Sequence, residues 1–123
     1  MTTMQELKGT VLAESPVAGL RHVGTLEEFD GILLAYCCQA ETGQYYLQYW
    51  ADCDARRHRW MFARVPKEAI EQLKQDLSKL YAVLSSQILD DFVFYVDQQN
   101  GKAVQIMQVA VKDIPEDYLP KRS

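Results

Sequence analysis

The dipeptide Asn100-Gly101 constrains the fold of this chain more than any other feature. Both residues accept positive φ, as the two central positions of a type I′ turn require. The flanking segments, DFVFYVDQ before the turn and KAVQIMQVAV after it, are rich in β-branched and aromatic residues, which favour strands. The sequence therefore predicts a β-hairpin near the C-terminus and an antiparallel sheet around it.

A second group of strands is predicted upstream. The apolar segment 32–40 (ILLAYCCQA) precedes a turn at Thr42-Gly43, and residues 45–51 (YYLQYWA) follow that turn. A third segment, 58–65 (HRWMFARV), comes after a polar loop at 53–56. Each run is bounded by turn-forming residues, as strands usually are. These segments predict three consecutive antiparallel strands.

An amphipathic helical segment is predicted between the two groups of strands. Pro66 suits the first position of a helix, where its missing N–H costs nothing. Apolar residues then recur at spacings of three and four, at Ile70, Leu73, Leu77, Leu80 and Leu84. Ser78 is expected to cap a second short helix within this segment. The β-β-β-α-β-β order predicts an α+β domain with a mainly antiparallel sheet and the helical segment packed on one face.

The length of 123 residues fits a single domain. We expect residues 1–28 to form an N-terminal extension with one short strand at Leu7–Leu12, residues 29–120 to form the domain, and 121–123 to be a tail. No signal-peptide pattern and no apolar run of membrane-spanning length is present, so no membrane association is expected. The three cysteines are an odd number, and two are adjacent, which favours reduced thiols in the cytoplasm.

Side-chain alternation along the first three strands predicts two faces. Turns at 42–43 and 53–56 place Cys38 opposite Leu47 and Trp50 opposite Arg59. The expected core face carries Leu34, Tyr36, Cys38, Leu47, Tyr49, Trp60 and Phe62. The expected outer face carries Cys37, Gln39, Tyr46, Gln48, Trp50, Asp52, Arg59 and Met61. Within the outer face, the set Tyr46, Gln48, Trp50, Arg59 and Met61 is predicted to be an interaction surface, because such residue types are enriched at interface hot spots.

The segments FDGILLA, YYLQYWAD, HRWMFARV and IPEDYLP carry a family resemblance. From Phe29 to Pro120 the chain resembles a small uncharacterised bacterial domain family with a Tyr-Leu-x-Tyr-Trp-x-Asp, Arg-Trp-Leu and Leu-Pro-Glu-x-x-Leu-Pro pattern. Met61 and Ile114 stand where that pattern has leucine. The resemblance implies a shared fold and no known activity, so it implies no catalytic residue.

Metal binding and cysteine catalysis are both weakly indicated. Asp52, Cys53, Asp54 and His58 could gather at a loop, but no Cys-x-x-Cys spacing is present and strand geometry separates the cysteines. A nucleophile at Cys37 or Cys38 would need His22 or His58 within hydrogen-bond reach. Cysteines in the middle of strands are usually small buried hydrophobes. We therefore expect no metal, no cofactor and no enzymatic activity.

The leading hypothesis is a non-catalytic module or accessory subunit that binds a protein partner, or itself, through the predicted interaction surface. An alternative is a nucleic-acid contact at Arg56, Arg57 and Arg59, although the net charge of −4 disfavours it. The competing interpretation of this run is a solvated hairpin tip with Arg59 stacked over Trp50. A third alternative is an acidic modulator of a nucleic-acid enzyme. Its candidate residues are Glu27, Glu28, Asp30, Asp90, Asp91, Asp113, Glu116 and Asp117.

Overall fold

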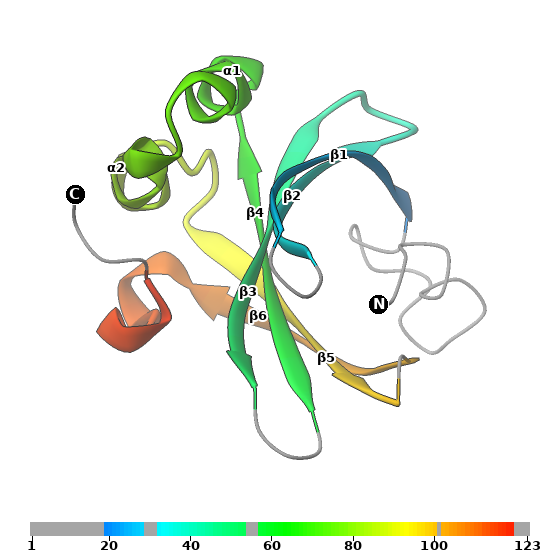
Figure 1. Ribbon diagram of the computed structural model, residues 1–123. Helices are drawn as coiled ribbons and strands as arrows, with labels where there is room; N and C mark the ends of the chain where they lie inside the picture. The colour runs from blue at the N-terminus through cyan, green and yellow to red at the C-terminus, as the bar shows by residue number, and fades with distance from the viewer. Residues whose placement is uncertain (1–18, 29–31, 54–56, 101, 120–123) are drawn as a thin grey trace.

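The structure is a computed structural model that describes residues 19–28, 32–53, 57–100 and 102–119. In these residues each strand pairs antiparallel with the next one along the chain, which gives one six-stranded sheet in the order β1 to β6 (Figure 1). The strands are β1 (Leu20–Glu28), β2 (Ile32–Gln39), β3 (Tyr45–Cys53), β4 (His58–Val65), β5 (Phe92–Gln99) and β6 (Lys102–Ala110). The helices α1 (Lys67–Gln75) and α2 (Leu80–Ser86) connect β4 to β5. The predicted α+β class is confirmed.

The sheet begins earlier in the chain than predicted. The prediction that residues 1–28 form an extension is wrong over 20–28, because these residues form β1, which pairs with β2 from Leu20 opposite Gln39 onward. The strand predicted at Leu7–Leu12 lies outside the described residues, as does the predicted tail at 121–123.

The predicted C-terminal hairpin is confirmed. Asn100 has a φ of 52°, and Gln99 pairs with Lys102 across the turn. Six residues of β6 then pair with β5 in unbroken register, from Gln105 opposite Asp97 to Ala110 opposite Phe92. One irregularity lies between this stretch and the turn, where β6 carries an extra residue, Val104.

The predicted helical segment is confirmed as two short helices, with two differences at its ends. Pro66 is the N-cap of α1 rather than its first helical residue. The break between the helices is a 3-10 turn, η3 (Leu77–Lys79), in which Leu77 is 37% exposed instead of lying on the buried stripe. The cap of this turn is Asp76, whose carboxylate accepts a 3.0 Å hydrogen bond from the backbone N–H of Ser78. The predicted cap of the second helix at Ser78 is wrong, because the N-cap of α2 is Lys79 and no side-chain hydrogen bond caps that helix.

The two faces of the sheet carry separate apolar cores. On the face covered by α1 and α2, called the helix face, strand residues pack against the buried helix residues Ala69, Ile70, Leu73, Leu80, Val83 and Leu84. The opposite, concave face gathers residues from all six strands, namely Leu20, Cys37, Tyr46, Trp60, Phe62, Phe94, Val96 and Ala103. The cluster extends from Leu20 on the first strand to Ala103 on the last, and the sheet curls along this face (Figure 1).

The strand register corrects part of the predicted face assignment. Cys38 pairs with Tyr45 rather than with Leu47, a two-residue difference that leaves the faces of β2 and β3 as predicted, with Tyr36 and Leu47 on the helix face. In β4 the difference is one residue: Trp50 pairs with Trp60, not with Arg59. A one-residue slip moves every side chain to the other face. Trp60 and Phe62 therefore lie on the concave face, and Met61 lies on the helix face.

Candidate functional site

The predicted exposed aromatic face does not form. Tyr46, Gln48 and Met61 are only 7%, 3% and 0% exposed, and Trp50 and Arg59 are half-buried. The slip in β4 also separates the set, since Trp50 lies against the concave core whereas Met61 lies in the core of the helix face. The prediction that these five residues form an exposed surface is therefore wrong.

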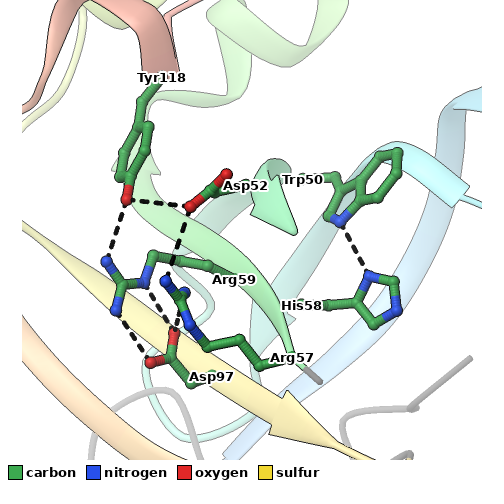
Figure 2. A network of polar contacts seen from close by, with 7 residues as sticks. All are labelled: Trp50, Asp52, Arg57, His58, Arg59, Asp97 and Tyr118. Carbon is green, nitrogen blue, oxygen red and sulfur yellow. Dashed lines mark hydrogen bonds and ion pairs between the residues drawn. The ribbon is translucent and has the colours of Figure 1, made fainter. Parts of the chain in front are cut away.

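Polar side chains gather instead where the β3–β4 hairpin leaves the body of the sheet (Figure 2). Asp52, Arg59 and Asp97 stand opposite one another on three neighbouring strands, β3, β4 and β5. A bulge at Ala51 shifts the register between Trp50 and Asp52, so that Asp52 comes level with Arg59. Bulges commonly re-aim a side chain in this way. We call the set of Asp52, Arg57, Arg59, Asp97 and Tyr118 the Arg59 cluster.

Arg59 is the centre of this cluster. Its Nε and Nη2 donate to Oδ1 and Oδ2 of Asp97 at 2.8 and 3.0 Å, and its Nη1 donates to the Tyr118 hydroxyl at 3.1 Å. The side chains of Arg59 and Asp97 are only 16% and 5% exposed. These hydrogen bonds, led by the one to Asp97, raise the pKa of the guanidinium, so Arg59 stays charged. The guanidinium lies 5.2 Å from the ring centroid of Tyr95, and the predicted stacking on Trp50 is wrong.

Arg57 extends the cluster toward the hairpin tip. Its Nη1 lies 3.6 Å from Oδ1 of Asp97, and its Nη2 lies 3.7 Å from Oδ2 of Asp52. The Tyr118 hydroxyl also donates to Asp52, at 3.4 Å. Two guanidinium groups are thus balanced by two carboxylates. Of the three arginines predicted to contact nucleic acid, Arg57 and Arg59 are held by acidic partners, and Arg56 lies outside the described residues.

His58 is engaged beside the cluster. Its Nδ1 accepts a 3.2 Å hydrogen bond from Trp50 Nε1, and the two rings are 5.7 Å apart between centroids (Figure 2). Across the described ranges, no three His, Cys, Asp or Glu side chains lie close enough to hold a metal ion. Of the loop residues considered as ligands, Cys53 is exposed and Asp54 is not described.

Cys37 is buried in an environment that suppresses thiol chemistry. Burial, together with the neighbouring Cys38, raises the pKa of its thiol to about 12. The Sγ donates to Gln48 Oε1 at 3.6 Å. His22 pairs with Cys37 in the register of β1 and β2, but its Nε2 contacts Thr25 Oγ1, at 3.4 Å. The group is a neutral thiol, which is a poor nucleophile.

The acidic residues considered as phosphate mimics lie on several separate elements. Asp90 forms two hydrogen bonds with Arg64, at 2.8 and 2.9 Å. Glu27 and Glu28 end β1, whereas Asp113 and Glu116 lie in the 3-10 turns η4 (Val111–Asp113) and η5 (Glu116–Tyr118) after β6. Asp30 lies outside the described residues.

Comparison with known protein families gives one result. A family model described as "Family of unknown function (DUF6575)" matches residues 9–123. The chain belongs to this family. The predicted resemblance to an uncharacterised domain family is thereby confirmed, and the match starts upstream of Phe29, so it includes β1. No curated protein and no solved structure matches the chain. Among the described helices, none has the length and apolar character needed to cross a bilayer.

In this member of the family, the two edges of the sheet differ in a way that the sequence prediction missed. Edge strands expose unpaired backbone groups, and proteins usually protect them with charges and bulges. The β1 edge has both, because its sequence LRHVGTLEE contains Arg21, Glu27 and Glu28 and its register with β2 is irregular at three places. The β6 sequence KAVQIMQVA has one charge, at its first residue, and one irregularity. The signal that indicates an unprotected edge is this run of eight uncharged residues.

Proposed function

We propose that this chain is a non-catalytic protein-interaction module that binds an extended segment of a protein partner, or of itself, along the edge of β6 that no other described strand covers. In this recognition mode the added strand forms backbone hydrogen bonds with the sheet edge, and alternate side chains give specificity. The observation that carries the proposal is the contrast between the edges: β1 is charged and irregular, whereas β6 is neutral and regular over Gln105–Ala110.

The β6 edge offers both backbone and apolar contacts. In the described part of the chain β6 pairs with β5 alone, so the N–H and C=O groups of alternate β6 residues point away from the sheet. Val104 is 49% exposed, Gln105 and Gln108 are exposed, and Ile106 and Met107 are half-buried at the rims of the two cores. An added strand would cover these side chains on both faces of the sheet.

The Arg59 cluster supports this function by tying β5, the strand with which β6 pairs, to β4. Asp97 belongs to β5, the only described partner of β6, and Arg59 fixes it to β4 through two hydrogen bonds. Tyr118 attaches η5 to the same point. A rigid template lowers the ordering cost of binding. The cluster is thus a structural support for the binding edge and not a catalytic centre.

Photocrosslinking tests the proposal. The photoreactive residue p-benzoylphenylalanine is placed at Gln105 on the β6 edge or, as a control, at Thr25 on the β1 edge, and adducts formed in the native cells are identified by mass spectrometry. We expect an adduct from position 105 that disappears when Gln108→Lys is added and persists when Val23→Lys is added. Equal adducts from both edges, or an adduct that Gln108→Lys leaves unchanged, would contradict the proposal.

Three earlier expectations stay predictions alongside this proposal: the cytoplasmic location, the bacterial origin and the absence of a cofactor. The nucleic-acid alternative also stays untested. The pairing of Arg57 and Arg59 with Asp52 and Asp97 gives it no added support.

A further inference from the structure

We infer that the strand added to the β6 edge is β6 of a second copy of this chain, so that two sheets join across a twofold axis into one continuous antiparallel sheet. The inference rests on the proposed function, because it names the partner of the same edge. Three features of the described residues carry it: the charge along β6, the geometry of self-pairing, and the difference between β6 and β1.

Charge is compatible with self-pairing at this edge. The chain carries a net charge of −4, so two copies repel on average. Like charges directly opposite each other also destabilise strand pairs. From Ala103 to Ala110, β6 has no charged residue, so two identical edges meet without repulsion. When the strands run antiparallel, Lys102 of each copy lies beyond Ala110 of the other, near the end that carries the exposed acids Asp91 and Asp113.

The geometry of β6 suits a twofold axis. In an antiparallel pair, residues directly opposite each other point to the same face of the sheet. A twofold axis perpendicular to the sheet keeps every side chain on its own face. Opposite residues of the two copies therefore share a face when the axis passes between one residue and its own copy. The unbroken stretch Gln105–Ala110 alternates between the two faces: Ile106 belongs to the concave core, and Met107 and Val109 belong to the core of the helix face. With Gln108 opposite its own copy, Met107 faces Val109 and Ile106 faces Ala110, so in this register each core continues across the junction, apolar against apolar.

The β1 edge is a poor alternative partner for β6. Pairing β6 with β1 of another copy would be head-to-tail, and such contacts build open filaments unless the rotation closes. The three register irregularities of β1 disturb the regular spacing that a ladder needs. Its charges, Glu27 and Glu28 at one end and Arg21 at the other, would meet neutral side chains. Pairing of β6 with its own copy avoids each of these costs.

The dimer is expected to be weak. A stable interface usually buries about 800 Å² on each partner, and a single strand pair covers less than that. We therefore expect dissociation at low concentration and dimers at concentrations of about 100 μM, within the range of transient contacts.

Sedimentation velocity of charge-swapped variants tests the inference. One variant carries Gln105→Lys and Gln108→Lys, and a second carries Gln105→Glu and Gln108→Glu; both positions are exposed, so folding is preserved. A control variant carries Val23→Lys and Thr25→Lys on β1, where Val23 is as exposed as Val104 (50% and 49%). Circular dichroism and urea unfolding of each variant verify that it is folded.

We expect the wild type and the β1 control to reach twice the chain mass of 14.1 kDa as concentration rises. Each charged β6 variant alone should remain a monomer, and an equal mixture of the two should form the dimer again, because opposite charges then face each other. A monomeric wild type at every concentration, or a mixture that fails to dimerise, would overturn the inference. If photocrosslinking at Gln105 still captures a different protein, the proposed function stands without self-pairing. If it captures nothing, both are wrong.

Discussion

Arg59 binds Asp97 through two parallel hydrogen bonds of 2.8 and 3.0 Å, which join β4 to β5 across 38 residues of sequence. Bidentate arginine–carboxylate pairs are among the strongest hydrogen-bonded contacts in proteins. Because Asp97 is almost fully buried, removing Arg59 leaves Arg57, at 3.6 Å, as the one described cation that can compensate the charge of its carboxylate.

We predict that Arg59→Leu lowers the free energy of unfolding by about 3 kcal/mol, the usual cost of breaking a buried ion pair from one side. Urea unfolding followed by tryptophan fluorescence measures it. The double variant Arg59→Leu/Asp97→Leu should recover most of that loss, since no buried charge is left behind. A loss below about 0.5 kcal/mol, typical of a surface pair, would show that this contact does not hold the strands together.

Removing either of two tyrosine hydroxyls near Arg59 should change the free energy of unfolding, but in opposite directions. The hydroxyl of Tyr95 is buried and has no hydrogen-bond partner in the described part of the chain, whereas that of Tyr118 bonds with Arg59 and Asp52. Tyr95→Phe should therefore raise the free energy of unfolding by about 1 kcal/mol, and Tyr118→Phe should lower it by about the same amount. Thermal unfolding of the two variants side by side checks both. Equal shifts in the same direction would argue against the described hydrogen bonding.

The register of β4 is tested at Met61, which is fully buried on the helix face. Met61→Glu should lower the free energy of unfolding by at least about 3 kcal/mol, because a carboxylate without a partner enters an apolar core. The matched control is Val104→Glu on the exposed edge, where a change within about 0.5 kcal/mol is expected. If chemical denaturation finds Met61→Glu as mild as the control, Met61 faces solvent and the register described for β4 is wrong.

The buried Cys37 thiol should make the free energy of unfolding depend on pH in the alkaline range. Its pKa is about 12 in the folded chain, against an ordinary value of 9.0, so the unfolded chain releases this proton first as the pH rises. The free energy of unfolding should fall from pH 9 upward, by about 1.4 kcal/mol per pH unit, until the folded pKa is reached. Buried tyrosines titrate in the same range, so the measured quantity is the difference in slope between wild type and Cys37→Ala. Parallel slopes for the two proteins would mean that the thiol is not desolvated.

The sequence predicted those elements whose causes are local. The Asn100-Gly101 pair predicted the C-terminal hairpin, in which Asn100 has positive φ. The spacing of Ile70, Leu73, Leu80 and Leu84 predicted the helices. The faces of β2 and β3 also followed from alternation. The face of β4 did not, because it depends on a bulge at Ala51 and on a turn placed one residue later than the polar loop indicated. Neither feature has a local sequence signal as strong as Asn-Gly.

The Arg59 cluster was hidden from the sequence for a related reason. Arg57 and Arg59 belong to one basic run, but their acidic partner Asp97 lies on a strand 38 residues beyond Arg59, and no local sequence pattern links the two strands. Only the six-strand order brings the three residues together. The β6 edge was missed because β1, its protected counterpart, was assigned to an extension. Once β1 is known to be the other edge, its charges and irregular register can be compared with the uncharged, regular β6.

The central claim is that the β6 edge is the recognition surface, and amide hydrogen exchange measured by NMR tests it most directly. At low concentration the outward-facing amides of Gln105–Ala110 should exchange rapidly. On association, with a second copy or with the crosslinked partner, the same amides should become protected while those of β1 stay unchanged. Protection that appears instead in β1 or in α1, with no change along β6, would contradict the account.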